Sequence, residues 1–512
     1  MHYPSKKEFI KKARQGNLIP VYRELLADLE TPVSAFLEIG RGEYSYLLES
    51  VEGPESVARY SFLGSSPSLI FKSKAGDIEI IQGAKVKKFK SSDPLGEIKR
   101  LMQQYKFVPV EGLPRFCGGL VGFMSYDMVR FFEQIPDANP DDLNLPDCLF
   151  LLTDTILIFD HIKGVIKIIN NVYLKDRKSK KKVARAYEEA IGKIEKVAAR
   201  LKKSSLSKSA KPSAAPRTKF KVKSNLSREK FTKIVNKAKD YIREGEIIQA
   251  VLSQRFSLKF STSPFDIYRA LRSINPSPYM FYLKLKDFCL AGSSPELFVR
   301  CEEGNVAVRP IAGTRARGKD ARQDERLVTQ LLADPKERAE HIMLVDLGRN
   351  DIGRVCIYGS VEIAELMAIE KYSHVMHIVS EVRGKLRKDK DVYELIKASF
   401  PAGTVAGAPK IRAMEIIDEL ENTRRGPYAG LVGYFSFSGN LDSCITIRTI
   451  LIKDKTAYIQ AGAGIVADSL PQREYQETKN KARAQILAVE LAEKKGDRPL
   501  FHLEPSKRGR LT

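Results

Sequence analysis

Acidic residues recur in pairs on two segments that the sequence predicts to be helices. Glu474 and Glu477 are three residues apart, hence on one face of a helix, and Lys481 follows one turn further along that face. Glu337 and Glu340 form a second pair with the same spacing. Mg²⁺ is commonly bound through one or two carboxylates and several waters. Two facing helices could therefore hold one hard cation, whereas an exposed helix with a Glu–Lys ion pair is the simpler interpretation of the later segment alone.

Three loops rich in small residues are predicted, and in such loops the backbone can approach a ligand closely. Ala461–Gly464 directly precedes the later helix, and the other two are Arg309–Arg315 and Gly403–Pro409. Thr314 and Thr404 add hydroxyl groups to these two loops. Neither of them contains the GK[ST] of a phosphate-binding loop, so a nucleotide is not indicated. Together with the paired carboxylates, the loops favour a site that holds an anion and a cation side by side.

The composition is that of a globular protein. The chain has 512 residues, of which 43% are hydrophobic and 29% charged, enough for a sizeable core. We expect a cytoplasmic protein that is not a membrane protein, since no apolar run is long enough to span a bilayer and the first residues contain no apolar signal region. Six Cys without CxxC spacing and six His indicate free thiols rather than disulfides or a zinc site.

The net charge of +23 raises the possibility of a nucleic-acid partner. The excess is concentrated in a segment that resembles a linker and at the C-terminus, in 175–182, 193–211, 219–223 and 507–510. These stretches lack the interleaved aromatic residues on which bases stack. We therefore expect no nucleic-acid partner and interpret these residues as solvated charge, with a basic binding module of the same fold as the alternative class.

Strand and helix patterns divide the chain into two halves. Strand-like runs fill Ile19–Ile81, helices are predicted over 91–105 and 184–201, and a hairpin is predicted over 148–172. The low-complexity segment 202–218 is rich in Ser, Lys, Ala and Pro and is predicted to be a linker. We predict an N-terminal domain over 17–201, a catalytic domain over 219–495 and a basic tail over 496–512, with one large interleaved domain as the alternative.

The second half mixes helices and strands without the regular alternation of a doubly wound sheet, which indicates an α+β fold. The predicted helices are 227–245, 264–274, 324–333, 335–346, 374–383, 393–399 and 409–422. The predicted strands are 247–260, 279–285, 289–293, 297–306, 360–368, 429–437 and 441–453.

Eight motifs occur in an order and spacing that resemble the chorismate-utilising enzymes, and among them the large subunits of anthranilate synthases. They are GSSPE (292–296), PIAGTR (310–315), EHIMLVDLGRND (340–351), YSHVMH (372–377), GTVAGAPK (403–410), GPYAG (426–430), IRT (447–449) and QAGAGIVADSLPQREYQETKNKA (460–482). The resemblance covers roughly Asn17 to Ala492. It implies a large two-sheet β-sandwich flanked by helices.

The resemblance also implies roles for individual residues. Glu340 and Glu477 match Mg²⁺ ligands, with Glu337 and Glu474 as their water-holding neighbours. The groups that match the chorismate pocket are Gly313, Thr314, Tyr428, Arg448, Gly462, Ala463, Gly464 and Lys481. The residues that match the chemistry are Gln249, Glu296, His377 and Thr404, with Glu296 as the acid for the departing 4-hydroxyl group and His377 beside the bond that breaks when pyruvate leaves. A histidine that only packs in the core is the alternative for His377.

Two positions distinguish the branches of the family. Gln249 stands where water-using branches resemble each other in carrying a lysine, which favours ammonia as the nucleophile. Ala312 stands where aminodeoxychorismate synthases commonly carry a nucleophilic lysine. The resemblance thus implies attack of ammonia on chorismate, loss of the 4-hydroxyl group and elimination of pyruvate to give anthranilate. Aminodeoxychorismate synthesis is the alternative.

The same resemblance implies regulation and a partner. Residues that match a tryptophan inhibitor site are Glu49, Ser50, Pro278, Tyr279, Met280 and Cys444, although Leu47–Ser50 could also be only a core strand. No amidotransferase nucleophile motif occurs in the sequence, so a separate glutamine amidotransferase subunit, and hence a hetero-oligomer, is implied for glutamine-dependent activity.

Overall fold

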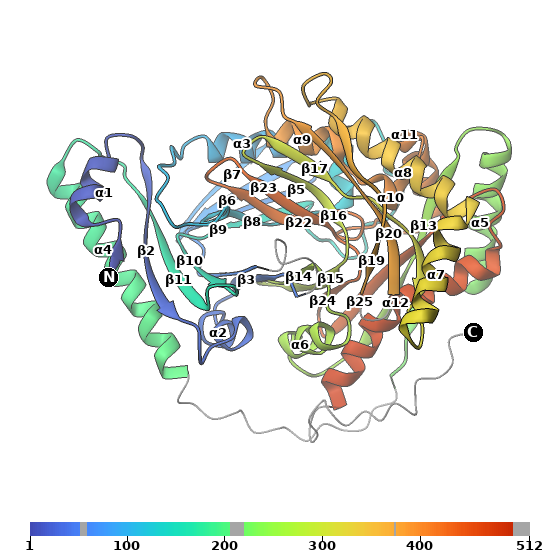
Figure 1. Cartoon of the computed structure of the whole chain (residues 1–512), viewed down its shortest axis with the longest axis horizontal. Helices are drawn as coiled ribbons and strands as arrows, with labels where there is room; N and C mark the ends of the chain where they lie inside the picture. The colour runs from blue at the N-terminus through green and yellow to red at the C-terminus, as the bar shows by residue number, and fades with distance from the viewer. Residues whose placement is uncertain (52–58, 205–219, 373–374, 495–512) are drawn as a thin grey trace.

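Two antiparallel sheets form the centre of the computed structural model, which describes residues 1–51, 59–204, 220–372 and 375–494 (Figure 1). The first sheet contains, in order, β1 (His2–Tyr3), β2 (Leu18–Leu26), β11 (Val165–Tyr173), β10 (Thr155–Asp160), β4 (Tyr60–Ser65), β3 (Tyr44–Glu49), β14 (Tyr279–Leu285), β15 (Phe288–Ser294), β24 (Thr449–Lys453), β25 (Thr456–Ile465), β13 (Gln249–Lys259) and β12 (Lys223–Ser224), with β21 (Gly407–Ala408) beside β13.

The second sheet packs face to face with the first. It contains, in order, β18 (Ile311–Ala316), β20 (Val375–Lys385), β17 (Asn305–Val308), β16 (Leu297–Glu302), β23 (Leu441–Ile445), β22 (Leu431–Ser436), β8 (Gly119–Met124), β9 (Cys148–Leu152), β5 (Leu69–Lys74), β6 (Asp77–Gln82) and β7 (Lys85–Lys90), with β19 (Glu362–Lys371) as an edge strand beside β20.

Helices cover the outer faces of both sheets (Figure 1). They are α1 (Lys6–Lys12), α2 (Pro32–Ile39), α3 (Pro94–Met102), α4 (Lys180–Ser204), α5 (Arg228–Arg243), α6 (Pro264–Ile274), α7 (Ala321–Ala333), α8 (Pro335–Gly353), α9 (Val392–Ser399), α10 (Gly403–Ala406), α11 (Lys410–Leu420) and α12 (Pro471–Lys494), with one short 3₁₀ turn at Tyr126–Phe131. This arrangement confirms the predicted α+β sandwich flanked by helices.

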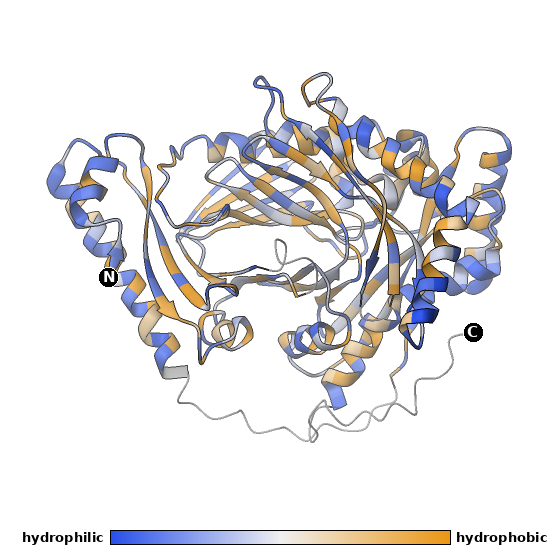
Figure 2. Cartoon of the chain, viewed as in Figure 1, coloured by the Kyte–Doolittle hydropathy of each residue, from blue (hydrophilic) through white to orange (hydrophobic). Residues whose placement is uncertain are grey.

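The core has three main layers. Aromatic and aliphatic side chains such as Phe62, Phe123 and Tyr434 fill the space between the sheets. A second cluster lies between the first sheet and helices α1, α2, α4, α6 and α12, and a third lies between the second sheet and helices α3, α8, α9 and α11. Figure 2 shows the corresponding pattern, with hydrophobic residues concentrated along the strands and hydrophilic residues on the outer helices.

Both sheets contain strands from both halves of the chain. In the first sheet Glu49 of β3 is paired with Met280 of β14, and in the second Gly122 of β8 is paired with Gly433 of β22. The predicted boundary at 202–218 lies outside the described residues except for Lys202–Ser204, which end α4, and the tail 496–512 also lies outside them. The division into two domains remains a prediction.

The predicted helix over 374–383 is wrong, because Val375–Lys385 form strand β20. Alternate residues from Met376 to Gly384 are buried, which is the two-residue period of a strand, and β-branched Val and Ile recur along it. The sequence prediction also missed α2, which begins at a Thr31 N-cap with a capping box to Ser34.

Four further predictions need correction. The expected strand 441–453 is divided into β23 and β24 by a turn in which Arg448 has a φ of 51°. Two of the expected loops are regular structure: Ala461–Gly464 lies within β25, and Ile311–Arg315 lies within β18. The third, 403–409, forms the short helix α10 and strand β21.

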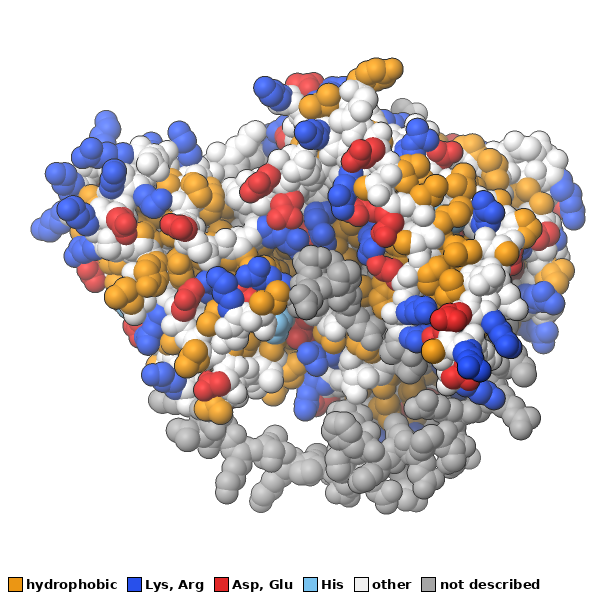
Figure 3. Space-filling view, in the orientation of Figure 1, with side chains coloured by type: hydrophobic (Ala, Val, Ile, Leu, Met, Phe, Trp, Pro, Cys, Tyr) orange, Lys and Arg blue, Asp and Glu red, His pale blue; other side chains and the backbone are white. Residues whose placement is uncertain are grey.

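Basic side chains gather over the end of the molecule formed by α1 and α4 (Figure 3). The exposed lysines there include Lys6, Lys7 and Lys11 of α1 and Lys180 and Lys181 of α4. None of the helices in the described part of the chain combines the length and the hydropathy that a membrane span needs.

Candidate active site

Most of the predicted site residues converge at one end of strand β25. Gly464 lies against Gln249 of β13 and Glu340 of α8, since a Cβ on Gly464 would come within 2.6 Å of the Gln249 amide nitrogen and 3.7 Å of Glu340 Oε1. Two residues earlier on the same strand face, a Cβ on Gly462 would come within 2.6 Å of the Tyr428 hydroxyl oxygen. A side chain at either position would therefore displace Gln249 or Tyr428.

The two carboxylate pairs lie on α8 and α12, as predicted. Gln249 Nε2 donates to Glu340 Oε1 at 2.9 Å, and Lys481 Nζ lies 2.6 Å from Glu477 Oε1. Burial raises the pKa of Glu340, and the carboxylates of Glu337 and Glu477 raise it further. The pKa of Glu474 is raised by burial and by Glu477. Four carboxylates thus share a region where their charges repel one another.

The donor set suits a divalent cation that keeps part of its water shell. In the described residues, no three His, Cys, Asp or Glu side chains are close enough to form a ready-made metal site. The Gln249 side-chain oxygen is buried and has no hydrogen-bond partner. Carboxylate oxygens are the ligands that Mg²⁺ prefers. A Mg²⁺ ion bound mainly through waters would offset the repulsion between the carboxylates, and one of its waters would give the Gln249 oxygen a hydrogen-bond partner.

Glu296 is buried where β15 leads into β16, with a side chain that is 6% exposed. Burial raises the pKa of its carboxyl group to about 8, against a lowering by the hydroxyl of Thr404 and the backbone of Ile311. The group is therefore protonated at neutral pH. A protonated carboxyl group in a buried site can donate a proton to a departing hydroxyl group.

His377 lies on β20 and faces the strand that carries the predicted Thr314. Its Nδ1 is 2.9 Å from Thr314 Oγ1, and the two residues are paired across β18 and β20. Burial and, to a smaller extent, the positive charge of Arg448 lower the pKa of His377 to about 4. The imidazole is therefore neutral near pH 7 and can accept a proton.

Arg448 and Lys481 supply the positive charges of the site. Arg448 Nη1 donates to the backbone oxygen of Lys481 at 2.5 Å, and Lys481 Nζ donates to the backbone oxygen of Gly462 at 3.0 Å. Arg448 is half-buried, the loss of solvent around its guanidinium lowers its pKa, and among the described residues it has no ion-pair partner. A poorly solvated guanidinium without a carboxylate partner is suited to bind an anionic ligand.

A buried ion pair that sequence reasoning missed supports the Tyr428 side of the site. The Arg425 guanidinium donates to both carboxylate oxygens of Glu421, at 2.6 and 3.0 Å, and to the backbone oxygens of Val405 and Val251. Its centre lies 5.5 Å from the Tyr428 ring centroid. Arg425 thus connects the 403–409 segment, strand β13 and Tyr428. Its place one residue before the GPYAG motif was the available signal.

Arg315 was also missed as a partner of the predicted carboxylates. Its guanidinium donates to Glu337 Oε1 at 2.9 Å and to Asp334, the N-cap of α8, at 3.0 Å. Arg315 ends the PIAGTR motif, so its presence in that motif was a signal, but its partner could not be identified without the fold.

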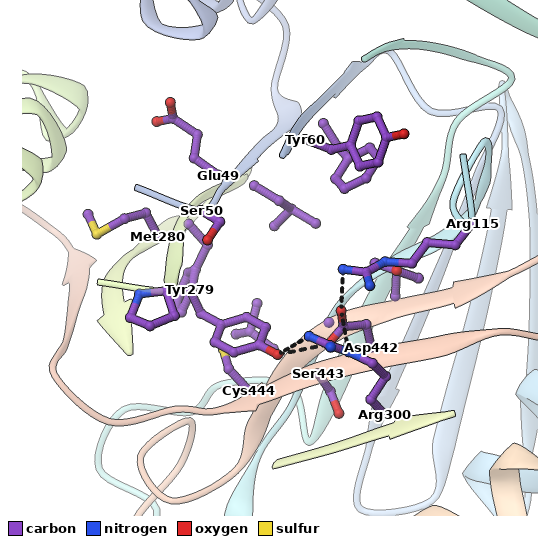
Figure 4. Close-up of a pocket in the computed structure, with 17 residues that line it drawn as sticks. Glu49, Ser50, Tyr60, Arg115, Tyr279, Met280, Arg300, Asp442, Ser443 and Cys444 are labelled. Atoms are coloured by element: carbon purple, nitrogen blue, oxygen red, sulfur yellow. Dashed lines mark hydrogen bonds and ion pairs between the residues drawn. The ribbon is translucent and has the colours of Figure 1, made fainter. Parts of the chain in front are cut away.

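The residues predicted to bind tryptophan line a separate cavity between the sheets. The lining of this cavity includes Glu49, Ser50, Pro278, Tyr279, Met280 and Cys444. Figure 4 shows Ser50 and Tyr279 around the cavity, whereas the Glu49 carboxylate points away from it. That carboxylate instead accepts hydrogen bonds from Tyr268 and Arg272.

The charged groups that face this cavity are Arg115, Arg300 and Asp442 rather than the predicted Glu49 carboxylate. Arg300 donates to Asp442 at 3.2 Å and to the Tyr279 hydroxyl at 2.9 Å, and Arg115 donates to Asp442 at 3.2 Å (Figure 4). The Ser50 hydroxyl is buried and has no partner. An amino acid with a large apolar side chain would therefore meet two guanidinium groups, one carboxylate and a free hydroxyl group here.

Comparison with known proteins identifies the family. Residues 43–487 match the model of the family described as chorismate binding enzyme. The chain belongs to this family. It is 49% identical over 496 residues to anthranilate synthase component 1 of Acetivibrio thermocellus, covering 96% of this chain and 99% of the relative. It is also 49% identical over 492 residues to the protein of the same name from Aquifex aeolicus, covering 96% and 98%.

A solved structure of the family has the same fold. The crystal structure of anthranilate synthase component I from Streptococcus pneumoniae is 37% identical in sequence, with a TM-score of 0.74, and the match covers 90% of this chain and 98% of that one. Family membership makes this chain a chorismate-utilising enzyme, as the sequence motifs predicted.

Proposed function

We propose that the chain is the chorismate-utilising subunit of an anthranilate synthase and that it converts chorismate and ammonia into anthranilate and pyruvate, the first committed step of tryptophan biosynthesis. Its relatives over nearly the whole chain carry that name. The observation that carries the proposal is the buried Glu296, whose pKa of about 8 makes it an acid at neutral pH beside a pocket with Arg448 and Lys481.

Chorismate carries two carboxylates, and the site has two kinds of group for them. In this proposal the anionic oxygens are bound by Arg448, Tyr428, the Lys481 ammonium and the backbone around Gly464. Glu340 and Glu477, with Glu337 and Glu474 beside them, would hold Mg²⁺. When bound, the ion would neutralise a substrate carboxylate and the facing glutamates together.

The first chemical step joins ammonia to the ring. The nitrogen lone pair forms a bond to C2, the ring double bonds shift, and the C4–oxygen bond breaks. Glu296 donates its proton to the departing hydroxyl group, which leaves as water. The product is an aminodeoxyisochorismate intermediate. Hydroxide alone is a poor leaving group, which is why a protonated carboxyl is required at this position.

The second step removes the side chain and makes the ring aromatic. The proton on C2 is lost, the C3–oxygen bond breaks, and the enolpyruvyl group takes up a proton to become pyruvate. His377, neutral near pH 7 and oriented by the Thr314 hydroxyl, is the residue proposed to act at this bond.

The nucleophile follows from two side chains. Gln249 is an amide bonded to Glu340, so it cannot remove a proton from water. Ala312 of β18 offers no amine for attack on the ring. These features favour ammonia as the nucleophile over water. The alternative function, aminodeoxychorismate synthesis for folate, shares ammonia but differs in its product.

The cavity around Ser50 and Tyr279 is proposed as the site at which tryptophan inhibits the enzyme. Its apolar walls suit an indole ring, while Arg115, Arg300 and Asp442 suit the carboxylate and ammonium of an amino acid. A separate glutamine amidotransferase subunit is proposed to supply ammonia, in keeping with the "component 1" in the names of the relatives.

The test uses the purified chain with chorismate, Mg²⁺ and ammonium at mildly alkaline pH, followed by anthranilate fluorescence. We expect fluorescent product that is abolished by EDTA and reduced by tryptophan. Chorismate consumption without fluorescence would refute the proposal and favour the aminodeoxychorismate alternative.

A further inference from the structure

A small polar chamber lies behind Tyr428, between the two sheets. Its walls include Arg255 of β13, Gln460 of β25, Thr446 and Tyr428, and its space is sufficient only for one or two water-sized molecules. Three of the wall residues have a buried polar atom without a partner: Arg255 Nη1, Thr446 Oγ1 and Gln460 Oε1. Their side chains belong to residues that are 6%, 1% and 8% exposed.

Unpaired polar atoms are costly when buried, and three around one cavity indicate that a small molecule binds there. The set combines a donor, an acceptor and a hydroxyl that can serve as either. No acidic residue lines the chamber. Arg425 also contributes to its wall, but its donors are all bonded to Glu421, Val405 and Val251. A cation would meet two guanidinium groups, whereas an anion would find both of them already paired, Arg255 with Asp142 and Arg425 with Glu421, so the chamber is best suited to a neutral molecule.

The chamber and the active site lie along the same face of β25. Gln460, Gly462 and Gly464 are alternate residues of this strand and point to the same face. Gln460 lines the chamber, Gly462 lies against the Tyr428 hydroxyl, and Gly464 lies beside Gln249 and Glu340. Four residues of strand place the chamber about 14 Å from Gly464. Tyr428 is the wall that separates the two spaces.

The outer end of the chamber is closed by an ion pair. Arg255 pairs with Asp142, whose side chain is 44% exposed, whereas that of Arg255 is 6% exposed. The adjacent Leu143 also lines the chamber, and its backbone oxygen accepts a hydrogen bond from Lys453 at 2.7 Å. Solvent therefore lies one side chain away from the chamber on this side.

We propose that this chamber holds neutral ammonia on its way to Tyr428 and the chorismate pocket. This inference rests on the proposed function, which requires ammonia as a substrate. Ammonia is the size of water, accepts one hydrogen bond and donates three, and so matches the free groups of Arg255, Thr446 and Gln460. Ammonium lacks the lone pair that would accept from Arg255.

The test is Thr446→Val, which removes the hydroxyl and nearly keeps the shape. With ammonium as the nitrogen source, we expect the KM for ammonia, calculated as the free base, to rise about tenfold from the loss of one hydrogen bond. The KM for chorismate should stay within about twofold. Gln460→Leu should act in the same direction. Ser73→Ala is the matched control, because it removes another buried, unpartnered hydroxyl far from the chamber.

An unchanged KM for ammonia in Thr446→Val would overturn the inference. Equal increases in both KM values would also overturn it, since the chamber would then only support Tyr428. If the wild-type chain makes no anthranilate from chorismate and ammonium, the proposed function fails, and the role for ammonia fails with it. A high-resolution crystal structure would then decide whether the chamber binds a small molecule: density within hydrogen-bonding distance of Arg255, Thr446 and Gln460 would support a site, and an empty chamber would exclude one.

Discussion

Glu296→Gln should separate the chemical role of this carboxyl group from its effect on folding. Glutamine has the same shape and is neutral, as the protonated carboxyl is at pH 7, so the binding pocket should keep its form. It cannot donate an acidic proton to the 4-hydroxyl group. General acid catalysis contributes about 10²–10⁴-fold, and we expect kcat to fall within that range while the KM for chorismate changes little.

The stability of the variant provides a second readout. The pKa of Glu296 is raised from 4.5 to about 8 by burial, so the native state binds the proton more tightly than the unfolded state. The stability from this group is present below pH 4.5 and is lost as the pH rises toward 8. The shift corresponds to about 5 kcal/mol as an upper bound. Glu296→Gln has no such loss, so the variant should gain stability over the wild type as the pH approaches 8.

The assay measures anthranilate formation from pH 6 to 10, with the rate expressed per concentration of free ammonia. For the wild type we expect this normalised rate to fall above about pH 8, as Glu296 loses its proton. Urea unfolding of both proteins at pH 5 and pH 8 gives the stability difference. Glu303→Gln, an exposed position, is the control. A Glu296→Gln enzyme with more than about a tenth of wild-type kcat would refute the assignment of Glu296 as the acid.

Three further predictions follow from the site and its supports. Glu340→Gln should raise the Mg²⁺ concentration needed for activity about tenfold or more, and an unchanged Mg²⁺ titration would exclude Glu340 as a ligand. The chain contains no Trp, so the fluorescence of added tryptophan reports its binding directly. Ser50→Phe should abolish tryptophan binding and leave anthranilate formation unchanged. Identical tryptophan titration curves for the variant and the wild type would mean that tryptophan binds elsewhere. Lys410→Met should lower the free energy of unfolding in urea by about 3–5 kcal/mol, since it leaves the Asp351 carboxylate buried without a partner. Adding Asp351→Leu to this variant should recover part of the loss. A loss below about 1 kcal/mol in Lys410→Met would contradict this prediction.

The helices of the fold were largely predictable where caps and periodicity agreed. Asp93-Pro94 begins α3, and Ser227 caps α5 through its side chain. The segment 374–383 was mispredicted because its apolar spacing suits both a helix and a strand, and only the pairing of β20 with β17, β18 and β19 distinguishes them. The turn at Arg448 that separates β23 from β24 depends on a φ of 51°, which no local residue pattern predicted.

The sequence indicated which residues belong to the candidate site, but it gave little information on the directions and contacts of their side chains. The spacing of Glu337 and Glu340 predicted a shared helix face, and α8 supplies it. The direction of Glu49 was not predictable, because its partners Tyr268 and Arg272 lie on α6, more than two hundred residues away in the chain. Likewise, the raised pKa of Glu296 results from burial between elements, which sequence spacing cannot express.

Lys410 and Asp351, two motif residues that are not predicted to contact a ligand, fix the positions of two segments of the site relative to each other. Lys410 Nζ donates to both carboxylate oxygens of Asp351, at 2.7 and 2.8 Å, and to the backbone oxygen of Ser399 at 3.0 Å. Asp351 lies near the C-terminal end of α8, the helix that carries Glu337 and Glu340, and Lys410 begins α11 directly after the 403–409 segment. Helix α8 and the Thr404 segment are therefore joined by a buried ion pair. Because a hydroxyl or carboxylate that is misplaced by about 1 Å can cost about 100-fold in rate, this junction explains why Lys410 and Asp351 occur in the same motifs as the candidate site residues Thr404 and Glu340.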